Sequence, residues 1–281
     1  MRRYSLSLLA TAAAISFSAS VASAADLPRK APAYVPPAPP PFSWTGFYIG
    51  GHGGGGWGTS ETALNNLSFG PPINTSFPQG GNAFSQTQMN GWLAGGTIGY
   101  NWQVNPWLVL GIEGDFTWTD IKGTSPCTFE GLIVPFSATG SCSTKVKWTA
   151  DLTGRVGFAV DRALLYVKGG VVWGKFDHAF NANVPVGGPA PIFFTNVATE
   201  SDTRVGGLLG AGIEYAFLPN WSAKIEYNFM DFGHSDRIFA GSFSEAAIGG
   251  PTFTYSANTN VRDVLHTVKV GVNYRFDWGR M

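Results

Sequence analysis

The segment that decides the fold reads Val268-Lys269-Val270-Gly271-Val272-Asn273-Tyr274-Arg275-Phe276. Large apolar residues occupy every second position, and polar residues or glycine fill the positions between them. This alternation predicts a β-strand with one apolar and one polar face. In a soluble protein the apolar face would point to a core, whereas in a membrane barrel it would point to lipid.

The start of the chain indicates export. Met1-Arg2-Arg3 is basic, residues 6–21 are uncharged and mostly apolar, and Ala22-Ser23-Ala24 places small residues where a signal peptidase cleaves. We therefore expect a signal peptide over residues 1–24, followed by a proline-rich periplasmic segment over residues 25–43. No later stretch offers the about 18 consecutive apolar residues that a membrane helix needs, which excludes a helical membrane protein.

The composition narrows the class further. The net charge is zero, which argues against a nucleic-acid partner because such a partner calls for a basic patch. Aromatic residues make up 14% of the chain and charged residues only 13%. A soluble surface with this balance would expose large apolar patches, whereas a surface that faces lipid requires them.

Alternation predicts eight strands from Trp44 onward. They span residues 45–57, 91–104, 107–120, 145–160, 163–176, 201–217, 221–233 and 263–276. Three connections are short and hold turn residues, namely Asn105-Pro106, Asp161-Arg162 and Leu218-Pro219-Asn220. The other four connections, residues 58–90, 121–144, 177–200 and 234–262, are long.

Short periplasmic turns that alternate with long external loops are typical of an outer-membrane barrel. A sheet in lipid must close on itself because all of its backbone groups must pair. We therefore predict an all-β fold, an eight-stranded antiparallel transmembrane β-barrel over residues 44–276, with a short tail over residues 277–281.

Aromatic residues recur at the two ends of the predicted apolar faces, as expected for the girdles of a membrane barrel. Trp92 and Trp102 on one strand, and Trp148 and Phe158 on another, mark the two edges of the apolar layer. The external girdle also includes Trp118, Trp173 and Phe229, and the periplasmic girdle includes Tyr100, Tyr215, Phe217, Trp221, Tyr274 and Phe276.

The opposite faces of the strands collect charges of both signs and should line the lumen. The acidic residues are Glu113, Asp115, Asp151, Glu214 and Glu226, and the basic residues are Lys147, Arg155, Lys168, Arg204, Lys224, Lys269 and Arg275. The interior of an eight-stranded barrel is just wide enough for side chains to fill it. Because buried charges persist only when they are paired, we predict a salt-bridged plug, with Arg155 and Asp151 in one paired network.

Three motifs also carry a family resemblance. Ala24-Ala25-Asp26-Leu27-Pro28, Trp44-Thr45-Gly46-Phe47-Tyr48-Ile49-Gly50 and Val270-Gly271-Val272-Asn273-Tyr274-Arg275-Phe276 resemble the porin-like small outer-membrane barrels and surface antigens of rhizobia and brucellae. The resemblance implies an eight-stranded barrel in the outer membrane, contact with lipopolysaccharide and with the barrel-assembly machinery, and no catalytic residues. Such chains usually end on the aromatic residue of the last strand, whereas here residues 277–281 follow Phe276.

Motifs for cofactors, metals and catalysis give weaker signals. Residues 51–56 match a dinucleotide-binding glycine pattern, but no helix follows, so a glycine-rich strand is the better interpretation. Histidines 52, 178, 234 and 266 lack the spacing of metal ligands. His234-Ser235-Asp236 invites comparison with barrel enzymes that act on lipid A, yet adjacent strand residues point to opposite faces. We expect neither a cofactor nor a metal.

The long connections hold two further features. Cys127 and Cys142 both fall within residues 121–144, and we expect them to form a disulfide in the oxidising envelope. The long connections also contain eleven phenylalanines, at positions 69, 77, 84, 129, 136, 180, 193, 194, 239, 243 and 253. One interpretation is that the strands continue above the membrane, and the alternative is an apolar surface site for a planar ligand such as haem or for another cell's surface.

The sequence thus predicts a non-enzymatic outer-membrane barrel that supports the envelope and presents a surface. The alternative is a narrow pore for small hydrophilic solutes. A haem- or host-binding surface protein and a lipid A-modifying enzyme are weaker alternatives.

Overall fold

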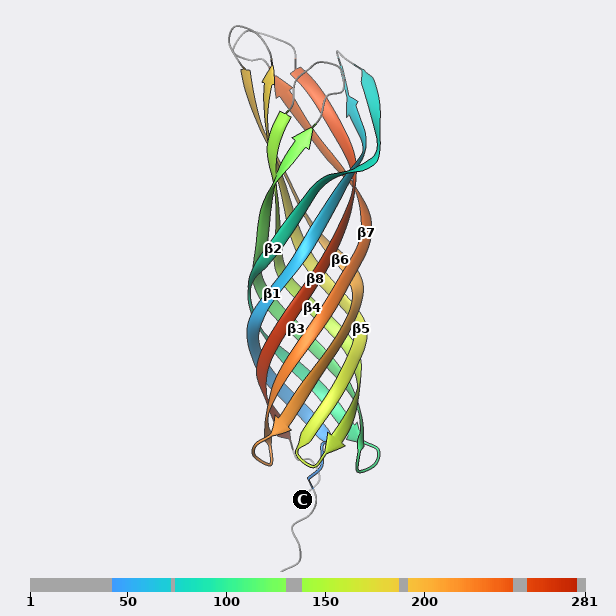
Figure 1. Cartoon of the computed structure of the whole chain (residues 1–281), viewed down its shortest axis with the longest axis vertical. Coiled ribbons are helices and arrows are strands. Elements are labelled where there is room, and N and C mark those ends of the chain that lie inside the picture. Colours follow the sequence, from blue (N-terminus) through green and yellow to red (C-terminus); the bar gives the residue numbers. More distant parts are fainter. Residues whose placement is uncertain (1–41, 72–73, 130–137, 187–191, 245–251, 277–281) are drawn as a thin grey trace, which may run out of the picture. The chain divides into compact units, whose positions relative to one another are not determined.

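The computed structural model describes residues 42–71, 74–129, 138–186, 192–244 and 252–276, and within them it forms a closed barrel of eight strands (Figure 1). The strands are β1 (Gly46–Phe69), β2 (Thr75–Gln103), β3 (Leu108–Phe129), β4 (Ala138–Val160), β5 (Ala163–Val186), β6 (Ile192–Ala216), β7 (Trp221–Ser244) and β8 (Thr252–Phe276). The expected signal peptide, most of the expected proline-rich segment and the tail lie outside the described residues.

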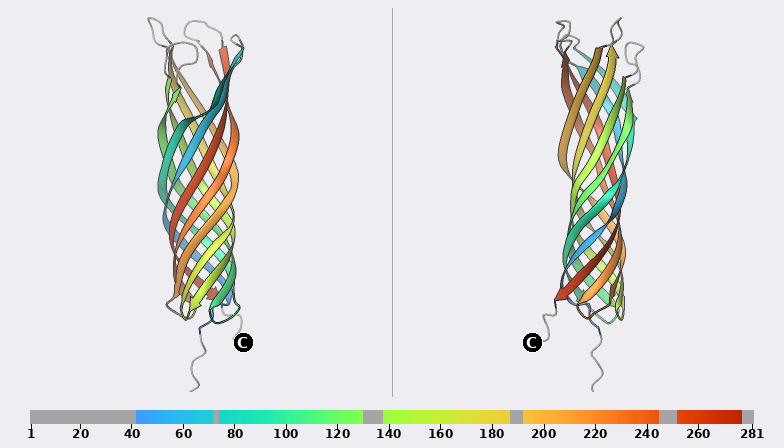
Figure 2. Two further views of the ribbon diagram at one scale, coloured as in Figure 1. Left: turned by 45° about the vertical axis from the view of Figure 1, so that its right-hand side comes forward. Right: turned by 90° about the vertical axis from the view of Figure 1, so that its left-hand side faces the viewer.

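Every strand pairs antiparallel with its neighbour in sequence, and β8 pairs with β1 to close the ring. Phe47 lies opposite Phe276, so both ends of the barrel domain are at one rim. Figure 2 shows that the three short turns lie at this same rim. The predicted fold class and strand number are confirmed.

The short turns follow from their residues. At the β4–β5 turn, Asp161 adopts a φ of 50°, a left-handed conformation that aspartate tolerates better than most residues. At the β2–β3 turn, the Asn105 side-chain oxygen accepts hydrogen bonds from the backbone N–H groups of Trp107 (3.1 Å) and Leu108 (2.8 Å). An asparagine side chain that bonds the backbone two residues on is a common way to stabilise a turn.

The strands are longer than predicted at the rim opposite the turns. Residues assigned to the four long connections are mostly strand, and β1 pairs with both β2 and β8 as far as Phe69. The extensions mix Ser, Thr, Gln and Asn with phenylalanines and other apolar residues at irregular spacing, so they show no regular alternation. The length of the irregular loops was therefore overestimated, and the interpretation that strands continue above the membrane is the correct one for these segments.

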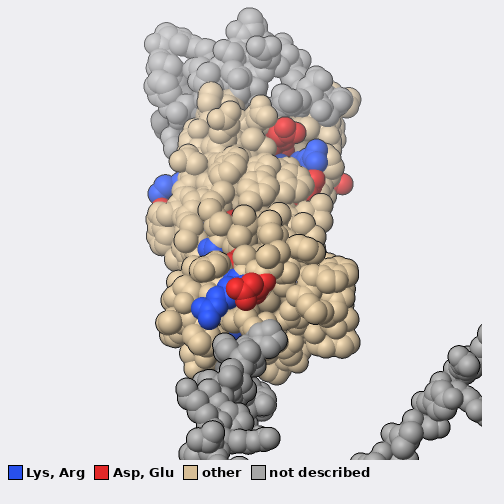
Figure 3. Space-filling view, turned by 60° about the horizontal axis from the view of Figure 1, so that its bottom comes forward, with Lys and Arg blue, Asp and Glu red and all other residues tan. Residues whose placement is uncertain are grey.

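The outward-facing residues form an apolar wall bordered by two aromatic belts. On β4 the outward residues run from Trp148 through Leu152 and Val156 to Phe158. The wall seen in Figure 3 is mostly free of charged side chains. The girdle residues predicted from the sequence all lie exposed or partly exposed on this wall, and they are Trp92, Trp102, Trp118, Trp148, Phe158, Trp173, Tyr215, Trp221, Tyr274 and Phe276.

Ring contacts hold the belts together across strands. At the turn rim, Phe47 meets Tyr100 edge-on at 4.7 Å and Trp221 meets Tyr274 at 5.1 Å. At the other edge, Trp57, which was not assigned to a girdle, stacks on His266 at 5.6 Å. Among the described residues, no helix is long and apolar enough to span a membrane.

Candidate functional site

The lumen is the candidate site because it holds nearly all of the buried polar side chains of the barrel. Inward-facing glycines make room for large partners on neighbouring strands. A Cβ at Gly212 would lie 2.6 Å from the ring of Tyr166, and a Cβ at Gly99 would overlap the ring of Tyr48. The inward side chains form four successive layers along the barrel, which we take in order from the turn rim.

The first layer is an apolar plug at the turn rim. It consists of Trp44, Val109, Ala159, Leu164, Tyr166 and Ala216, with Phe42 packed against it. The backbone N–H of Trp44 donates to the Gln103 side chain at 2.8 Å, which ties the segment before β1 to the end of β2. Arg275 lies in this region, over the ring of Phe42 at 4.5 Å, and donates to the carbonyl of Pro219 at 2.6 Å.

The second layer, which we call the charge layer, is centred on Glu113 of β3. Its carboxylate pairs with Lys168 of β5 at 2.9 Å and with Lys224 of β7 at 3.3 Å. Arg155 of β4 lies 3.5 Å away, and the hydroxyl of Tyr48 on β1 donates at 2.8 Å. One carboxylate therefore connects five strands across the lumen.

Two further carboxylates complete this part of the charge layer. Glu226 pairs with Lys168 at 2.8 Å and accepts hydrogen bonds from Tyr166 (2.7 Å) and Asn228 (2.8 Å). Glu214 pairs with Arg155 at 3.4 Å and accepts from Asn273 at 2.9 Å. The side chains of Glu113, Lys168, Lys224 and Glu226 are 0% exposed, so all four charges are shielded from solvent.

A second group lies beside this centre. Lys269 pairs with Asp115 at 2.9 Å and donates to Thr117 at 3.1 Å, and His52 lies 3.3 Å from the other oxygen of Asp115. Asp151 is buried beside them, but neither of its carboxylate oxygens has a hydrogen-bond partner among the described residues. The prediction that Arg155 and Asp151 share one paired network is therefore wrong for Asp151, whereas Arg155 is paired with Glu113 and Glu214.

The third layer is apolar and was not predicted. It contains Met89, Leu93, Ile121, Val146, Val172, Phe176, Leu208, Met230, Phe232 and Leu265, all buried inside the barrel. Several of these residues follow or precede an outward apolar residue, as in Leu208-Leu209 and Val171-Val172. Such adjacent apolar pairs break the alternation, and they are the signal that could have revealed an apolar layer within the lumen.

The fourth layer is polar and lies beyond the outer belt. Arg204, predicted to join the lumen charges, forms an ion pair here with Asp263 and donates to the carbonyl oxygens of Gly233 (2.9 Å) and Val261 (3.1 Å). Arg237 pairs with Asp202. Arg204 is thus separated from the charge layer by the apolar layer, and its partner Asp263 was missed by the sequence analysis.

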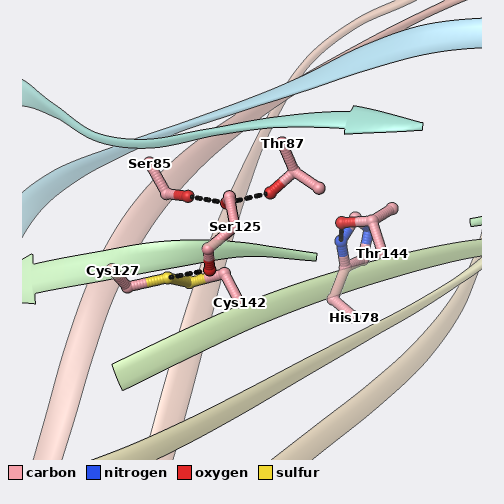
Figure 4. The surroundings of a disulfide bond; sticks show 7 residues. All are labelled: Ser85, Thr87, Ser125, Cys127, Cys142, Thr144 and His178. Atoms are coloured by element: carbon pink, nitrogen blue, oxygen red, sulfur yellow. Dashed lines mark hydrogen bonds between the residues drawn. A yellow bond between two sulfur atoms is a disulfide. The ribbon is translucent and has the colours of Figure 1, made fainter. Parts of the chain in front are cut away.

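The disulfide lies near the outer ends of β3 and β4, and Figure 4 shows its surroundings. Cys127 of β3 and Cys142 of β4 are bonded, and their Cα atoms are 5.8 Å apart. Next to them the Ser125 hydroxyl lies 2.8 Å from that of Ser85 and 2.6 Å from that of Thr87. Thr144 and His178 form a second hydrogen bond at 3.1 Å.

Lys147 is the one predicted lumen charge that lies outside the barrel. A β-bulge at this position skips Lys147 in the pairing with β5, so that Val146 pairs with Phe176 and Trp148 with Lys175. The bulge resets the alternation and turns Lys147 outward, where its side chain is 45% exposed and pairs with Asp177 at 2.6 Å.

The other candidate motifs do not form sites. His234 and Asp236 lie on the outside of β7 and both bond Asn260, while Ser235 is on the other face. Within the described ranges, no group of His, Cys, Asp or Glu could hold a metal ion. Of the eleven phenylalanines, only Phe239 has a described side chain, and it is half-buried; the predicted surface ligand therefore stays a prediction.

A closed eight-stranded barrel with two aromatic belts and a filled lumen defines a small outer-membrane β-barrel protein. The sequence matches the family described as "Outer membrane protein beta-barrel domain" over residues 9–276, and the chain belongs to this family. The resemblance seen in the motifs is thus confirmed, and so is the location in the bacterial outer membrane.

Curated relatives span nearly the whole chain. The 31 kDa outer-membrane immunogenic protein of Brucella melitensis is 32% identical over 261 residues, which cover 92% of this chain and 95% of the relative. The 22 kDa outer membrane protein of Rhizobium leguminosarum bv. viciae is 27% identical over 241 residues, covering 85% and 82%. Among solved structures, the attachment invasion locus protein Ail of Yersinia pestis has 14% identity, covers 80% of this chain and 99% of its own, and has a TM-score of 0.29.

Proposed function

We propose that this protein is a closed, non-enzymatic barrel that supports the outer membrane and presents a surface outside the cell. The observation that carries the proposal is the charge layer around Glu113. Its central side chains are 0% exposed and link strands on opposite sides of the lumen.

An ion that crossed the lumen would have to separate these pairs. Removing one partner of a buried ion pair typically costs about 3–5 kcal/mol because the other charge is left uncompensated. The ion would also have to pass the apolar plug around Trp44 and the apolar layer around Phe176. The paired charge layer thus lies between two apolar layers. This arrangement favours a lumen that stabilises the barrel over one that conducts ions.

The arrangement of Thr144, His178 and Asp263 superficially resembles a hydrolase site and needs separate consideration. His178 lies 3.1 Å from the Thr144 hydroxyl and 3.8 Å from Asp263. All three side chains are buried, and the Asp263 carboxylate is bound to Arg204. A substrate could reach the hydroxyl only if the barrel opened, which supports a non-enzymatic role.

Planar-bilayer recording tests the closed lumen. The purified, folded protein should give no stable current steps at concentrations where a general porin, reconstituted in parallel, conducts. Reproducible unitary currents that disappear when the protein is heat-unfolded would favour the alternative, a narrow pore for small hydrophilic solutes.

Two measurements on cells test the remaining parts of the proposal. Cells that lack the protein should leak periplasmic enzymes and become sensitive to detergents, and the wild-type gene should restore both properties. The mass spectrum of lipid A should be the same with and without the protein. A changed lipid A mass would show that the protein is an enzyme after all.

A further inference from the structure

Asp151 of β4 is a buried carboxyl group that takes no part in the ion pairs found among the described residues of the lumen. The residue is 4% exposed and faces the interior of the barrel. Neither of its carboxylate oxygens has a hydrogen-bond partner in the part of the chain that the structure describes. An ionised carboxylate that is buried without a partner is very costly, and such a group normally binds a proton instead.

The surroundings of Asp151 are acidic on one side and apolar on the other. Asp115 of β3 is its register partner, and Val172 of the apolar layer is its partner on β5. Side chains directly opposite each other on antiparallel strands have Cβ atoms about 5 Å apart. Two carboxyl groups that share a buried site do not both stay ionised, because like charges repel strongly where water is excluded.

Asp115 is the carboxyl group of this pair that stays ionised. Lys269 pairs with it at 2.9 Å, the Thr117 hydroxyl donates to it at 2.6 Å, and His52 lies 3.3 Å from its other oxygen. A neighbouring cation and hydrogen bonds from donors favour the ionised form of a carboxyl group. Asp151 lacks such hydrogen bonds, so the proton belongs on Asp151.

The two cations that act on Asp151 already have carboxylate partners. Lys168 of β5 pairs with Glu113 at 2.9 Å, and Lys269 of β8 pairs with Asp115 at the same distance. Both lysines attract the charge of Asp151 from a longer range, while Asp115 and Glu113 of β3 repel it. The two carboxylates thus offset much of the attraction by the two lysines.

The charges of the whole layer lead to the same conclusion. The acidic residues are Glu113, Asp115, Asp151, Glu214 and Glu226, and the basic residues are Arg155, Lys168, Lys224 and Lys269. Five negative and four positive charges leave a charge of −1 when His52 is neutral. Arg275 belongs to the turn rim, where it lies over Phe42 and donates to the carbonyl of Pro219. One proton therefore brings the charge layer to neutrality.

We propose that Asp151 is a proton-binding site and that the folded barrel holds one proton on this carboxyl group at pH 6. An aspartate of the unfolded chain is ionised at this pH, since its ordinary pKa is about 3.9. Folding then takes up one proton, so acid stabilises the folded barrel. A barrel that conducts ions could hold the same proton, so bilayer recording and the measurements below can fail independently.

Infrared spectroscopy of the folded protein detects the proton directly. The difference between the spectra of the wild-type protein and Asp151→Asn at pH 6 should contain the carbonyl stretching band of one protonated carboxyl group. The matched control is Glu61→Gln, which removes an exposed carboxylate and should give the bands of an ionised carboxylate. A gel shift on boiling shows that each variant is folded. Carboxylate bands in the Asp151→Asn difference spectrum would overturn the proposal.

The pH dependence of unfolding provides a second measurement. In reversible urea unfolding from lipid vesicles, the unfolding equilibrium constant of the wild-type protein should rise about tenfold more than that of Asp151→Asn between pH 5 and pH 6, because unfolding releases one proton. His52→Gln should retain the wild-type pH dependence. Equal pH dependence in the wild-type protein and Asp151→Asn would overturn the proposal. So would a pH dependence that disappears in His52→Gln, since His52 would then hold the proton.

Discussion

At the scale of single residues, Glu113 has the most consequential position in the lumen. Its carboxylate faces Lys168, Lys224 and Arg155 and accepts the Tyr48 hydroxyl. The net contribution of a buried ion pair to stability is often small, because desolvation offsets the attraction. The loss of the shared carboxylate is a different matter, since only Glu226 and Glu214 would then remain to balance three buried cations.

Glu113→Gln should therefore destabilise the barrel by about 3–5 kcal/mol. The measurement is the temperature at which the compact form is lost in detergent, read from boiled and unboiled gel mobility. Glu61→Gln, which removes an exposed carboxylate, is the control and should leave this temperature nearly unchanged. If the two variants lose their compact form at the same temperature, the charge layer does not stabilise the barrel.

Asp151 offers a contrast within the same layer. Its two oxygens lack hydrogen-bond partners among the described residues, so Asp151→Asn removes no hydrogen bond that the structure shows. We expect a change of less than about 1 kcal/mol, as for substitutions that break no specific interaction. A loss as large as that of Glu113→Gln would mean that Asp151 has a partner that the pairing described above does not include.

His178 should make the stability of the outer polar layer depend on pH. Burial, reinforced by Arg237 and opposed by Asp263, lowers the pKa of His178 below its usual range. The unfolded chain would bind a proton near a pKa of about 6.5, and the folded chain would not. The stability of this layer should therefore be complete above that pH and should fall as the pH decreases below it.

Limited proteolysis of the outer strands between pH 7.5 and 5.5 measures this effect. Cleavage of the wild-type protein, normalised to an unfolded substrate, should accelerate toward pH 5.5. His178→Gln should remove the acceleration, and His234→Gln, which alters an exposed histidine, should retain it. A pH response that persists in His178→Gln would assign it to another group.

At the scale of the elements, the outer ends of the strands lie beyond the aromatic belt. There they are held by pairing with neighbouring strands rather than by contact with lipid. β3 and β4 remain paired from Trp118 and Trp148 as far as Phe129 and Ala138. The disulfide crosses this pair near its end, and the two cysteines are 15 positions apart in the sequence. Its effect should be local because the membrane-spanning part of the barrel closes independently.

Cys127→Ser/Cys142→Ser should leave the barrel folded and loosen the outer ends of β3 and β4. The loop-closure model gives up to about 3 kcal/mol for a loop of this length. The check is faster proteolysis of this strand pair, with an unchanged gel shift on boiling. Loss of the gel shift in the double variant would show that the disulfide is needed for the whole barrel.

The alternation of residues predicted most of the inward and outward positions, and its failures have local causes. The bulge beside Lys147 depends on strand pairing, which a single strand's sequence does not reveal. The apolar layer was missed because Leu208, Val172 and Leu265 are each next to an outward apolar residue, and one periodic pattern cannot place both faces. Asp263 was predicted only as the first residue of its strand and was not counted among the lumen charges, although it belongs to the outer polar layer with Arg204.

At the scale of the whole molecule, closure is the property from which the rest follows. The pairing of β1 with β8 leaves no free edge over the described strands. A closed barrel resists detergent, so the unboiled protein should migrate differently from the boiled protein on a denaturing gel. The same mobility in both lanes would contradict the barrel itself.

The architecture was more predictable than the contacts. Strand number, turn positions and the aromatic belts follow from alternation and spacing, because lipid imposes the same demand on every strand. The partners of each lumen charge depend on the shear of the closed sheet, which brings side chains of β1, β4, β5 and β7 to the Glu113 carboxylate on β3. The residue pattern of a single strand cannot predict which side chains of other strands these charges contact.

The strand extensions also change what an immune system would meet on the cell. Their side chains are held in register by backbone pairing, with neighbouring strands contributing to each patch. An antibody raised against the intact surface would bind residues that are distant in sequence, such as those of β1 and β8. Short synthetic peptides and the boiled protein would present those residues separately, so the native barrel is the form in which such a surface is recognised.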